Sequence, residues 1–317
     1  MELLLWITVV TSILYSLQIV AGRPLMPYSL DYSFDSATGL VRLYNRPVML
    51  QFYLLASFVC PRFFTGNVNI YRLLFFVALM CTLGRTGIFI SIFSILLAMT
   101  FTGRTTKLIK VVVILGLLFL PFFDMVSQRY EGSGTTEDLS NTMSGGYKNF
   151  STGDGTMTYR IAWVYERGEY LIHRPIGEQI FGMGLISGSQ DIVYKMYHFR
   201  VGLIGEAGLI EQLYTPDISY GNLLTRLGFL GGAIYIVFVI SLMILFFRHR
   251  KDLPILTICT AQIIVMFIGA FSGSAMSNPS NFVIYFLTLS LLYSKNSEGL
   301  LRNRSSKWLF EKNNNNQ

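Results

Sequence analysis

Charged residues are scarce in this chain. Asp, Glu, Lys and Arg together make up 14% of its 317 residues, whereas hydrophobic residues make up 52%. The mean hydropathy is high, at +0.49. An average soluble domain contains about 25% charged residues. The composition therefore excludes an ordinary soluble domain and favours a membrane protein.

Cysteine and histidine are also few, with three of each. Cys60, Cys81 and Cys259 all lie within or at the ends of apolar stretches. Neither a disulfide framework nor a zinc site is therefore indicated, and no metal or cofactor is expected. The net charge of +7 does not require a nucleic-acid partner, because many of the basic residues gather beside apolar stretches.

Eight apolar runs dominate the sequence. Most are about 15–25 residues long, enough to cross a hydrocarbon core of about 30 Å. Only helices or closed barrels satisfy their backbone in lipid, and these runs do not alternate as barrel strands do. We therefore predict an all-α, polytopic integral membrane protein with about eight transmembrane helices. The runs cover residues 3–20, 47–60, 70–84, 86–102, 108–123, 221–247, 253–271 and 281–294.

The positions of lysine and arginine predict how these helices are oriented. If the helices alternate, the basic residues after the second, fourth and sixth runs lie on the same side as those of the tail, and that side is the cytoplasm. These residues are Arg62, Arg72, Arg104, Lys107, Lys110, Arg248, Arg250, Lys251, Lys295, Arg302, Arg304, Lys307 and Lys312. Both termini are then cytoplasmic. The chain divides into helices one to five (1–123), a large outward loop (124–219), helices six to eight (220–294) and a low-complexity tail (295–317) expected to be disordered.

The outward loop is the segment most informative about function. Its first third is rich in Gly, Ser and Thr and is expected to be mobile. A helix capped by Thr156 or Thr158 should follow and end near His173. It places Arg160, Trp163 and Arg167 on one face. This face could clamp an anionic group and a sugar ring, or it could lie on the lipid interface, with tryptophan at headgroup depth.

The end of the loop contains a second polar cluster. Asp217, Tyr220, Asn222 and Arg226 lead directly into the sixth apolar run, and Asn222 and Arg226 can share a face. Arg226 would lie about one turn inside the membrane boundary, where an ionisable residue is costly and tends to face a cavity or a partner. Snorkelling of its side chain to the surface is the alternative.

A further arginine, Arg85, lies between two apolar runs in "LGRTG". It is either the charged tip of a helical hairpin or part of a site. Arg23, Arg42 and Arg46 also fall on the predicted outer side, against the positive-inside trend. Together these arginines predict a basic basin at the outer boundary, suited to bidentate binding of phosphate. Its candidate ligands are lipid headgroups, lipid-linked diphosphates and soluble anions.

The order of these motifs resembles the O-antigen ligase/polymerase superfamily of bacterial envelope enzymes. A "GRTG" turn precedes the long outward loop, which contains "YRIAWVYERGEYLIHRPIGEQIFGMG" and ends in "DISYGNLLTRLGFLGG". An upstream segment, "GLVRLYNRPVML", also resembles the family, and the resemblance covers about residues 35–250. The matching residues are Asn45, Arg46, Pro47, Arg160, Trp163, Pro175, Gly177, Gly182, Gly184, Gly228, Gly231 and Gly232.

The resemblance implies transfer of a glycan from undecaprenyl diphosphate to a hydroxyl acceptor at the outer face of the inner membrane. Ligases of this superfamily have a histidine where this chain has Asp217, which favours a polymerase that adds repeat units over a ligase to lipid A–core. Family members usually have ten or more spans, against eight predicted here. A chain-length regulator and a flippase would be partners. A lipid-linked sugar flippase and a non-catalytic scaffold are the alternatives.

The resemblance also suggests roles for individual residues. Arg85 and Arg160, with Arg226 as a third candidate, would hold the diphosphate and stabilise it as a leaving group without a metal. Asp217 is the candidate general base. The expected substrate-binding residues are Arg167, Trp163, Arg226, Tyr220, Asn222 and Arg46. Other candidates for the base are Glu166, Glu169, Asp191 and His198, whereas His173 is expected to be structural.

Overall fold

The computed structural model describes most of the chain outside residues 104–134 and the tail. The described residues are 2–23, 25, 32–34, 41–43, 47, 49–82, 85–103, 109, 112–113, 116–117, 135–151, 155–184, 191–204, 209–215, 217–271, 273, 276 and 282–294. Most of the fifth predicted span, 108–123, lies outside these ranges. Arg46 and the tail 295–317, which was expected to be disordered, also lie outside them.

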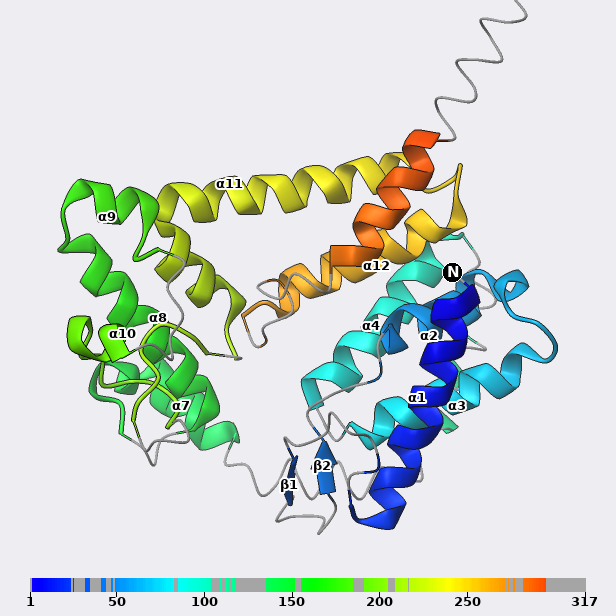
Figure 1. Cartoon of the computed structure of the whole chain (residues 1–317), viewed down its shortest axis with the longest axis horizontal. Coiled ribbons are helices and arrows are strands. Elements are labelled where there is room, and N and C mark those ends of the chain that lie inside the picture. The colour runs from blue at the N-terminus through cyan, green and yellow to red at the C-terminus, as the bar shows by residue number, and fades with distance from the viewer. Residues whose placement is uncertain are drawn as a thin grey trace, which may run out of the picture.

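The described part of the chain is all-α, as predicted, apart from one short antiparallel pair of strands (Figure 1). The pair joins β1 (Tyr32–Phe34) to β2 (Val41–Leu43). The α-helices are α1 (Glu2–Ala21), α2 (Leu50–Val59), α3 (Val68–Cys81), α4 (Arg85–Phe101), α7 (Thr135–Met143), α8 (Thr156–Ile172), α9 (Ile176–Phe181), α10 (Asp191–Met196), α11 (Ser219–His249), α12 (Pro254–Gly269) and a last helix, Val283–Ser294. Two short 3-10 turns cover Pro61–Phe63 and Gly146–Asn149.

The helices made from the apolar runs pack into one bundle. Buried side chains of α1 to α4, α11, α12 and the last helix form a single hydrophobic core. Its largest fully buried side chains include Tyr53, Phe75 and Phe246. Figure 1 shows this bundle in blue, cyan and orange beside a separate group of green helices.

Two described helices, α1 and α11, are long and apolar enough to cross a membrane. The other apolar helices contain 10–17 residues. Helix α11 contains 31 residues but is broken at Gly228, whose φ is 66° and ψ is −168°. Its apolar part begins after this break. Two such helices are weak support for a membrane protein, because a buried core helix or a signal sequence has the same character.

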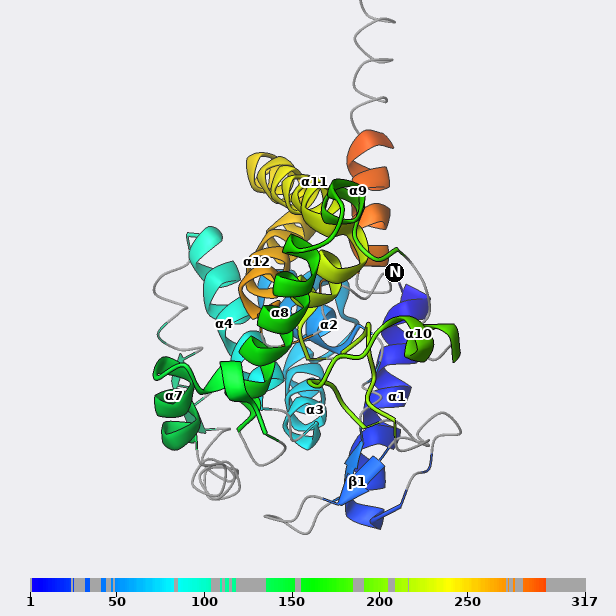
Figure 2. The ribbon, with the colours of Figure 1, turned by 90° about the vertical axis from the view of Figure 1, so that its left-hand side faces the viewer.

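Helices α7 to α10 and the chain up to residue 215 form the green group, called here the outward module (described residues 135–151, 155–184, 191–204 and 209–215). It has two small cores of its own, built around Trp163 and around Leu171. Figure 2, seen from the side of this module, shows α8 in front of the bundle, and in Figure 1 α11 extends from the module across to the bundle. The first third of the loop, expected to be mobile, contains helix α7.

Candidate functional site

The N-terminus of α8 is capped by α7. The carboxylate of Asp138 accepts hydrogen bonds from the backbone N–H groups of Met157 (2.7 Å) and Thr158 (2.9 Å), and from the Thr158 hydroxyl (2.6 Å). The predicted cap by Thr156 or Thr158 is wrong, since the N-cap residue is Gly155, which has no side chain to bond. Helix α8 ends at Ile172, as its predicted stop before Pro175 requires.

The Asp138 cap predicts an acid-sensitive module. Burial acts to raise the pKa of Asp138, but hydrogen bonds from Thr158 and Met157 and the charge of Arg160 outweigh it and lower the pKa below its usual value. The carboxylate therefore stabilises the module above the pKa of the unfolded chain, and this contribution is lost as pH falls through the lower folded pKa. Asp138→Asn should cost about 1 kcal/mol at pH 7.

Unfolding of purified protein measured between pH 7 and pH 3 checks this prediction. The stability difference between the wild type and Asp138→Asn should shrink as the pH falls. Glu137→Gln is the matched control, because Glu137 is the neighbouring, exposed carboxylate. A difference that stayed constant across this range would contradict the cap.

The two sequence segments that resemble the envelope enzymes meet where the module joins α11. The N–H of Met183 donates to the carbonyl of Thr225 (2.8 Å), and the N–H of Gly184 donates to the carbonyl of Arg226 (3.1 Å). Gly182 and Gly228 lie in backbone contact beside these bonds. The break in α11 therefore separates a short half, 219–227, attached to the module, from the long apolar half.

The short half of α11 is also fixed to α12 and to the residues just after it. The Ser219 hydroxyl donates to the carbonyl of Gly273 (2.6 Å), and the Tyr220 hydroxyl donates to the carbonyl of Phe267 (2.7 Å). The Tyr220 ring packs against Phe271, with 4.6 Å between ring centroids. Tyr220, a predicted substrate-binding residue, therefore holds the two helices together and presents its ring at their junction.

Asn222 and Arg226 share a face, as predicted, and this face is turned toward residues 214–215. The Asn222 side chain is buried and forms two hydrogen bonds with the backbone of Thr215, at 3.0 Å and 2.6 Å. The Arg226 guanidinium lies 5.5 Å from the centre of the Tyr214 ring. Asn222 thus orders the end of the loop, and in this structure it is bonded to protein and not turned toward a ligand.

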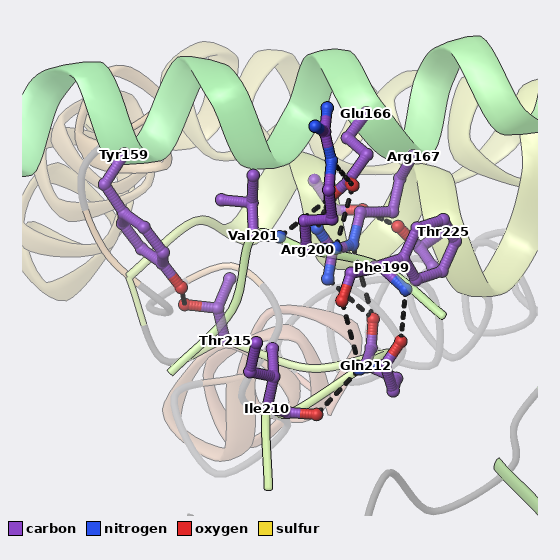
Figure 3. Close-up of polar contacts among 11 residues, drawn as sticks. Tyr159, Glu166, Arg167, Phe199, Arg200, Val201, Ile210, Gln212, Thr215 and Thr225 are labelled. Carbon is purple, nitrogen blue, oxygen red and sulfur yellow. Dashed lines mark hydrogen bonds and ion pairs between the residues drawn. The ribbon is translucent and has the colours of Figure 1, made fainter. Parts of the chain in front are cut away.

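Arg167 and Trp163 also share a face, but that face is the interior of the module. The Arg167 guanidinium lies between the rings of Trp163 and Phe199, 4.3 Å from each centre. It donates to the carbonyl of Gln212 at 2.9 Å and 3.3 Å and to Glu166 at 2.9 Å (Figure 3). Both side chains are 0% exposed. They therefore offer no surface to a phosphate or a sugar, and Trp163 does not lie at a lipid interface.

Arg167 remains protonated although its side chain is buried. Burial lowers its pKa to about 10, opposed by the negative charge of Glu166. The guanidinium remains charged at neutral pH and neutralises the neighbouring Glu166. Segments far apart in the sequence are held together by the bonds from Arg167 to Gln212 and from Arg200 and Val201 to Glu166. Gln212 extends the network, because its side chain pairs with the backbone N–H and carbonyl of Phe199 (Figure 3).

Arg160 and Arg226 differ from Arg167. Both side chains are only partly buried, and in each the Nε atom is enclosed without a hydrogen-bond partner. Each therefore has a charged donor that the described protein groups leave unused. Among the predicted arginines, these two have the strongest case as ligands for an anion.

Arg85 is the first residue of α4, and α3 ends at Cys81. Residues 83 and 84, where the predicted turn begins, lie outside the described residues. Figure 1 shows α4 beginning at the edge of the bundle nearer to α8. The placement of the Arg85 side chain and of Arg46 lies outside the described residues, and their roles stay predictions.

The candidate bases occupy different surroundings. Glu166 accepts bonds from the N–H groups of Arg200 (2.9 Å) and Val201 (3.0 Å) as well as from Arg167, so its role is structural. Asp217 is half-buried, and its backbone N–H donates to the Thr215 hydroxyl.

The remaining candidates lie on the outside of the module. His198 is exposed, and the Asp191 side chain lies outside the description. His173 ends α8, with its Nδ1 atom 2.8 Å from the carbonyl oxygen of Glu169, which agrees with the structural role expected for it.

A groove runs along the junction between the module and α11. It consists of two hollows of about 370 and 460 Å³ that share Val164 and Leu224 in their walls. The larger hollow lies at the break in α11 and is bounded by apolar side chains of α11 and α12, with Tyr220 beside them. The smaller lies along α8 and includes Tyr165, Glu169 and His173. Sequence reasoning missed the groove, because its walls come from helices that are far apart in the sequence.

Comparison with known proteins adds no family. The chain matches no protein-family model and no curated protein. Its function is therefore argued from the described structure: a broken apolar helix, two arginines with unused donors and an apolar groove.

Proposed function

We propose that this protein is a polymerase of lipid-linked oligosaccharide repeat units, such as those of an O-antigen or another surface polysaccharide. It would transfer the growing glycan from undecaprenyl diphosphate to a hydroxyl of the next lipid-linked repeat unit. The chain would lie in a bacterial inner membrane with about eight spans, both termini in the cytoplasm and the outward module in the periplasm. A flippase would deliver its substrate, and a chain-length regulator could act beside it.

One observation above all supports the proposal. The segments around Gly182 and Gly228, which resemble the envelope enzymes independently in sequence, form a single backbone contact at the edge of an apolar groove. A lipid-linked sugar needs such a junction, because its polyprenyl chain is apolar and its glycan is polar. The apolar walls at the break in α11 suit the chain, and the outward module beside them would face the glycan.

The reaction needs stabilisation of a diphosphate as it leaves. The acceptor oxygen forms a bond to the anomeric carbon of the donor sugar, and the bond between that carbon and the diphosphate oxygen breaks. The electron pair remains on undecaprenyl diphosphate, and the acceptor proton passes to a base. Arg160 and Arg226, with Arg85, would supply the positive charge that the leaving diphosphate requires.

Chromosomal Arg160→Ala and Arg226→Ala variants test this function. If the proposal holds, each lowers the polymerisation rate by about 10²-fold, as loss of one charge-stabilising donor does elsewhere. The surface polysaccharide should then collapse from a ladder to a single repeat unit at unchanged protein level. The matched control is Arg174→Ala, because Arg174 is exposed and paired with Glu178.

Two results would count against a polymerase. A ladder unchanged in both arginine variants and in the gene deletion would exclude the proposed function. Loss of every repeat from the surface, including the single unit, would favour ligation or flipping.

A further inference from the structure

The corner where α8 turns into α9 exposes three large apolar side chains. Ile172 is the last residue of α8, and Ile176 and Phe181 are the first and last residues of α9. Their exposed fractions are 60%, 74% and 67%. Single exposed hydrophobic residues are common on soluble proteins, whereas neighbouring ones mark a contact with a partner or a membrane. These three residues are called here the apolar corner.

The apolar corner is attached to the point where the long apolar half of α11 begins. Gly182 and Gly228 lie in backbone contact, so Phe181 comes just before this contact and Phe229 just after it. Phe229 and Leu230 are themselves 45% and 48% exposed. Figure 1 shows α9 beside the end of α11 that is farther from the bundle. The corner therefore continues the exposed apolar surface of α11.

That surface extends along the rest of α11. Ile234, Val237 and Phe238 are also exposed, and only 22% of the most apolar part of this helix is buried by the described protein. A helix that is apolar on all sides and long enough to span a bilayer belongs in lipid when protein does not cover it. The lipid that would surround α11 in the proposed membrane location reaches the corner without a break.

The polar groups of the corner are satisfied within the protein. The last carbonyls of a helix have no partner inside that helix. Here the Gln179 side-chain amide donates to the carbonyls of Ile172 (2.9 Å) and Arg174 (2.8 Å). Arg174 in turn pairs with Glu178 at 2.7 Å, so their charges cancel. Polar groups approach hydrocarbon at low cost only when they are paired in this way.

We propose that the apolar corner is a membrane anchor that inserts into the outer leaflet beside α11. This inference rests on the membrane location given under the proposed function. Apolar faces of interfacial helices insert about 5–10 Å into the boundary between headgroups and acyl chains. Arg174 and Glu178 would then lie at headgroup depth, where the long arginine side chain extends toward phosphate.

The anchor has a consequence for substrate entry. The larger hollow of the groove includes Gly228 and Phe229 in its walls, next to the corner. With the corner in the outer leaflet, this hollow lies at the depth of the acyl chains. The polyprenyl chain of a lipid-linked substrate then enters it sideways from the bilayer, without passing through water.

The test measures the depth of the corner with tryptophan fluorescence. Full-length protein is reconstituted in phosphatidylcholine vesicles in a Trp6→Phe, Trp308→Phe background, in which Trp163 is 0% exposed and gives a constant signal. Phe181→Trp adds a reporter at the corner, and Ile176→Trp is a second, independent variant. We expect lipid brominated in its acyl chains to quench about half or more of the added fluorescence, and iodide in the water to quench little.

Two further variants serve as controls. Met143→Trp places the reporter on α7, at an apolar residue of the same module that is 81% exposed. Figure 1 shows α7 at the opposite end of the module from α9, so iodide and not brominated lipid should quench this reporter. Phe238→Trp places it in the long half of α11, where brominated lipid should quench it.

The outcomes separate the anchor from the function on which it rests. If brominated lipid quenches Phe238→Trp while iodide quenches Phe181→Trp and Ile176→Trp, the corner faces water and only the anchor fails. Protection of both corner reporters from both quenchers would mean that protein covers the corner, such as a second copy of the chain, and would also overturn the anchor. If brominated lipid leaves Phe238→Trp unquenched, α11 does not lie in the membrane and the proposed function itself fails.

Discussion

Replacing Arg167 with alanine is expected to unfold the outward module. The substitution leaves Glu166 half-enclosed without its closest cation and removes the group between the Trp163 and Phe199 rings. Breaking a buried charge pair by removing one partner costs about 3–5 kcal/mol. Arg167→Lys should lose most of the same stability, because an ammonium cannot lie flat between two rings and reach the Gln212 carbonyl from two nitrogens.

Trp163 provides the measurement. The chain has three tryptophans, so a Trp6→Phe, Trp308→Phe background leaves Trp163, in the core of the module, as the single reporter. Thermal unfolding followed by its fluorescence should show the loss in Arg167→Ala. Arg200→Ala is the matched control, because Arg200 approaches the same carboxylate at 3.9 Å but its side chain is 84% exposed. An exposed pair is worth about 0–1 kcal/mol, so this control should stay close to the wild type.

The second large effect is expected at the contact between Gly182 and Gly228. Both residues have a positive φ with ψ near 180°, a conformation essentially restricted to glycine. A Cβ atom on Gly182 would lie 2.4 Å from the backbone N of Gly228, and one on Gly228 would lie 2.4 Å from the backbone N of Gly182. Neither backbone can move aside, because hydrogen bonds to Thr225 and Arg226 fix the two segments.

Gly182→Ala and Gly228→Ala should therefore each cost about 2–5 kcal/mol, the sum of backbone strain and overpacking. We expect the module to unfold at a lower temperature. We also expect protease to cleave it in membrane preparations kept below that temperature. Gly177→Ala is the internal control, because Gly177 belongs to the same motif but has open space where a Cβ would be. Equal stability of the Gly177 and Gly182 variants would show that the contact does not hold the module to α11.

Much of the fold could be predicted from local sequence. The apolar runs predicted the bounds of α1, α3, α4 and the long half of α11 closely. This is because a run of hydrophobic residues directly indicates a segment that is buried or in contact with lipid. The bounds of α8 followed from its proline stop. The strand pair β1–β2 and helix α7 were missed, since short polar segments have no strong period and these depend on partners elsewhere in the chain.

The candidate site could be predicted from the sequence only in part. Sequence alone identified the two segments that meet at the junction. It marked Arg226 as unusual because arginine is costly at a membrane boundary, and Arg160 because it can share a helix face with Trp163 and Arg167. It could not separate Arg160 from Arg167, or Glu169 from Glu166, since each pair has the same residue type on the same helix. Residues 199–204 and 209–215 cover one side of α8 and enclose Arg167 and Glu166 with hydrogen-bond partners up to 45 residues away. The opposite side, with Glu169, is left at the groove, because burial is decided by which distant segment covers a helix and not by the helix itself.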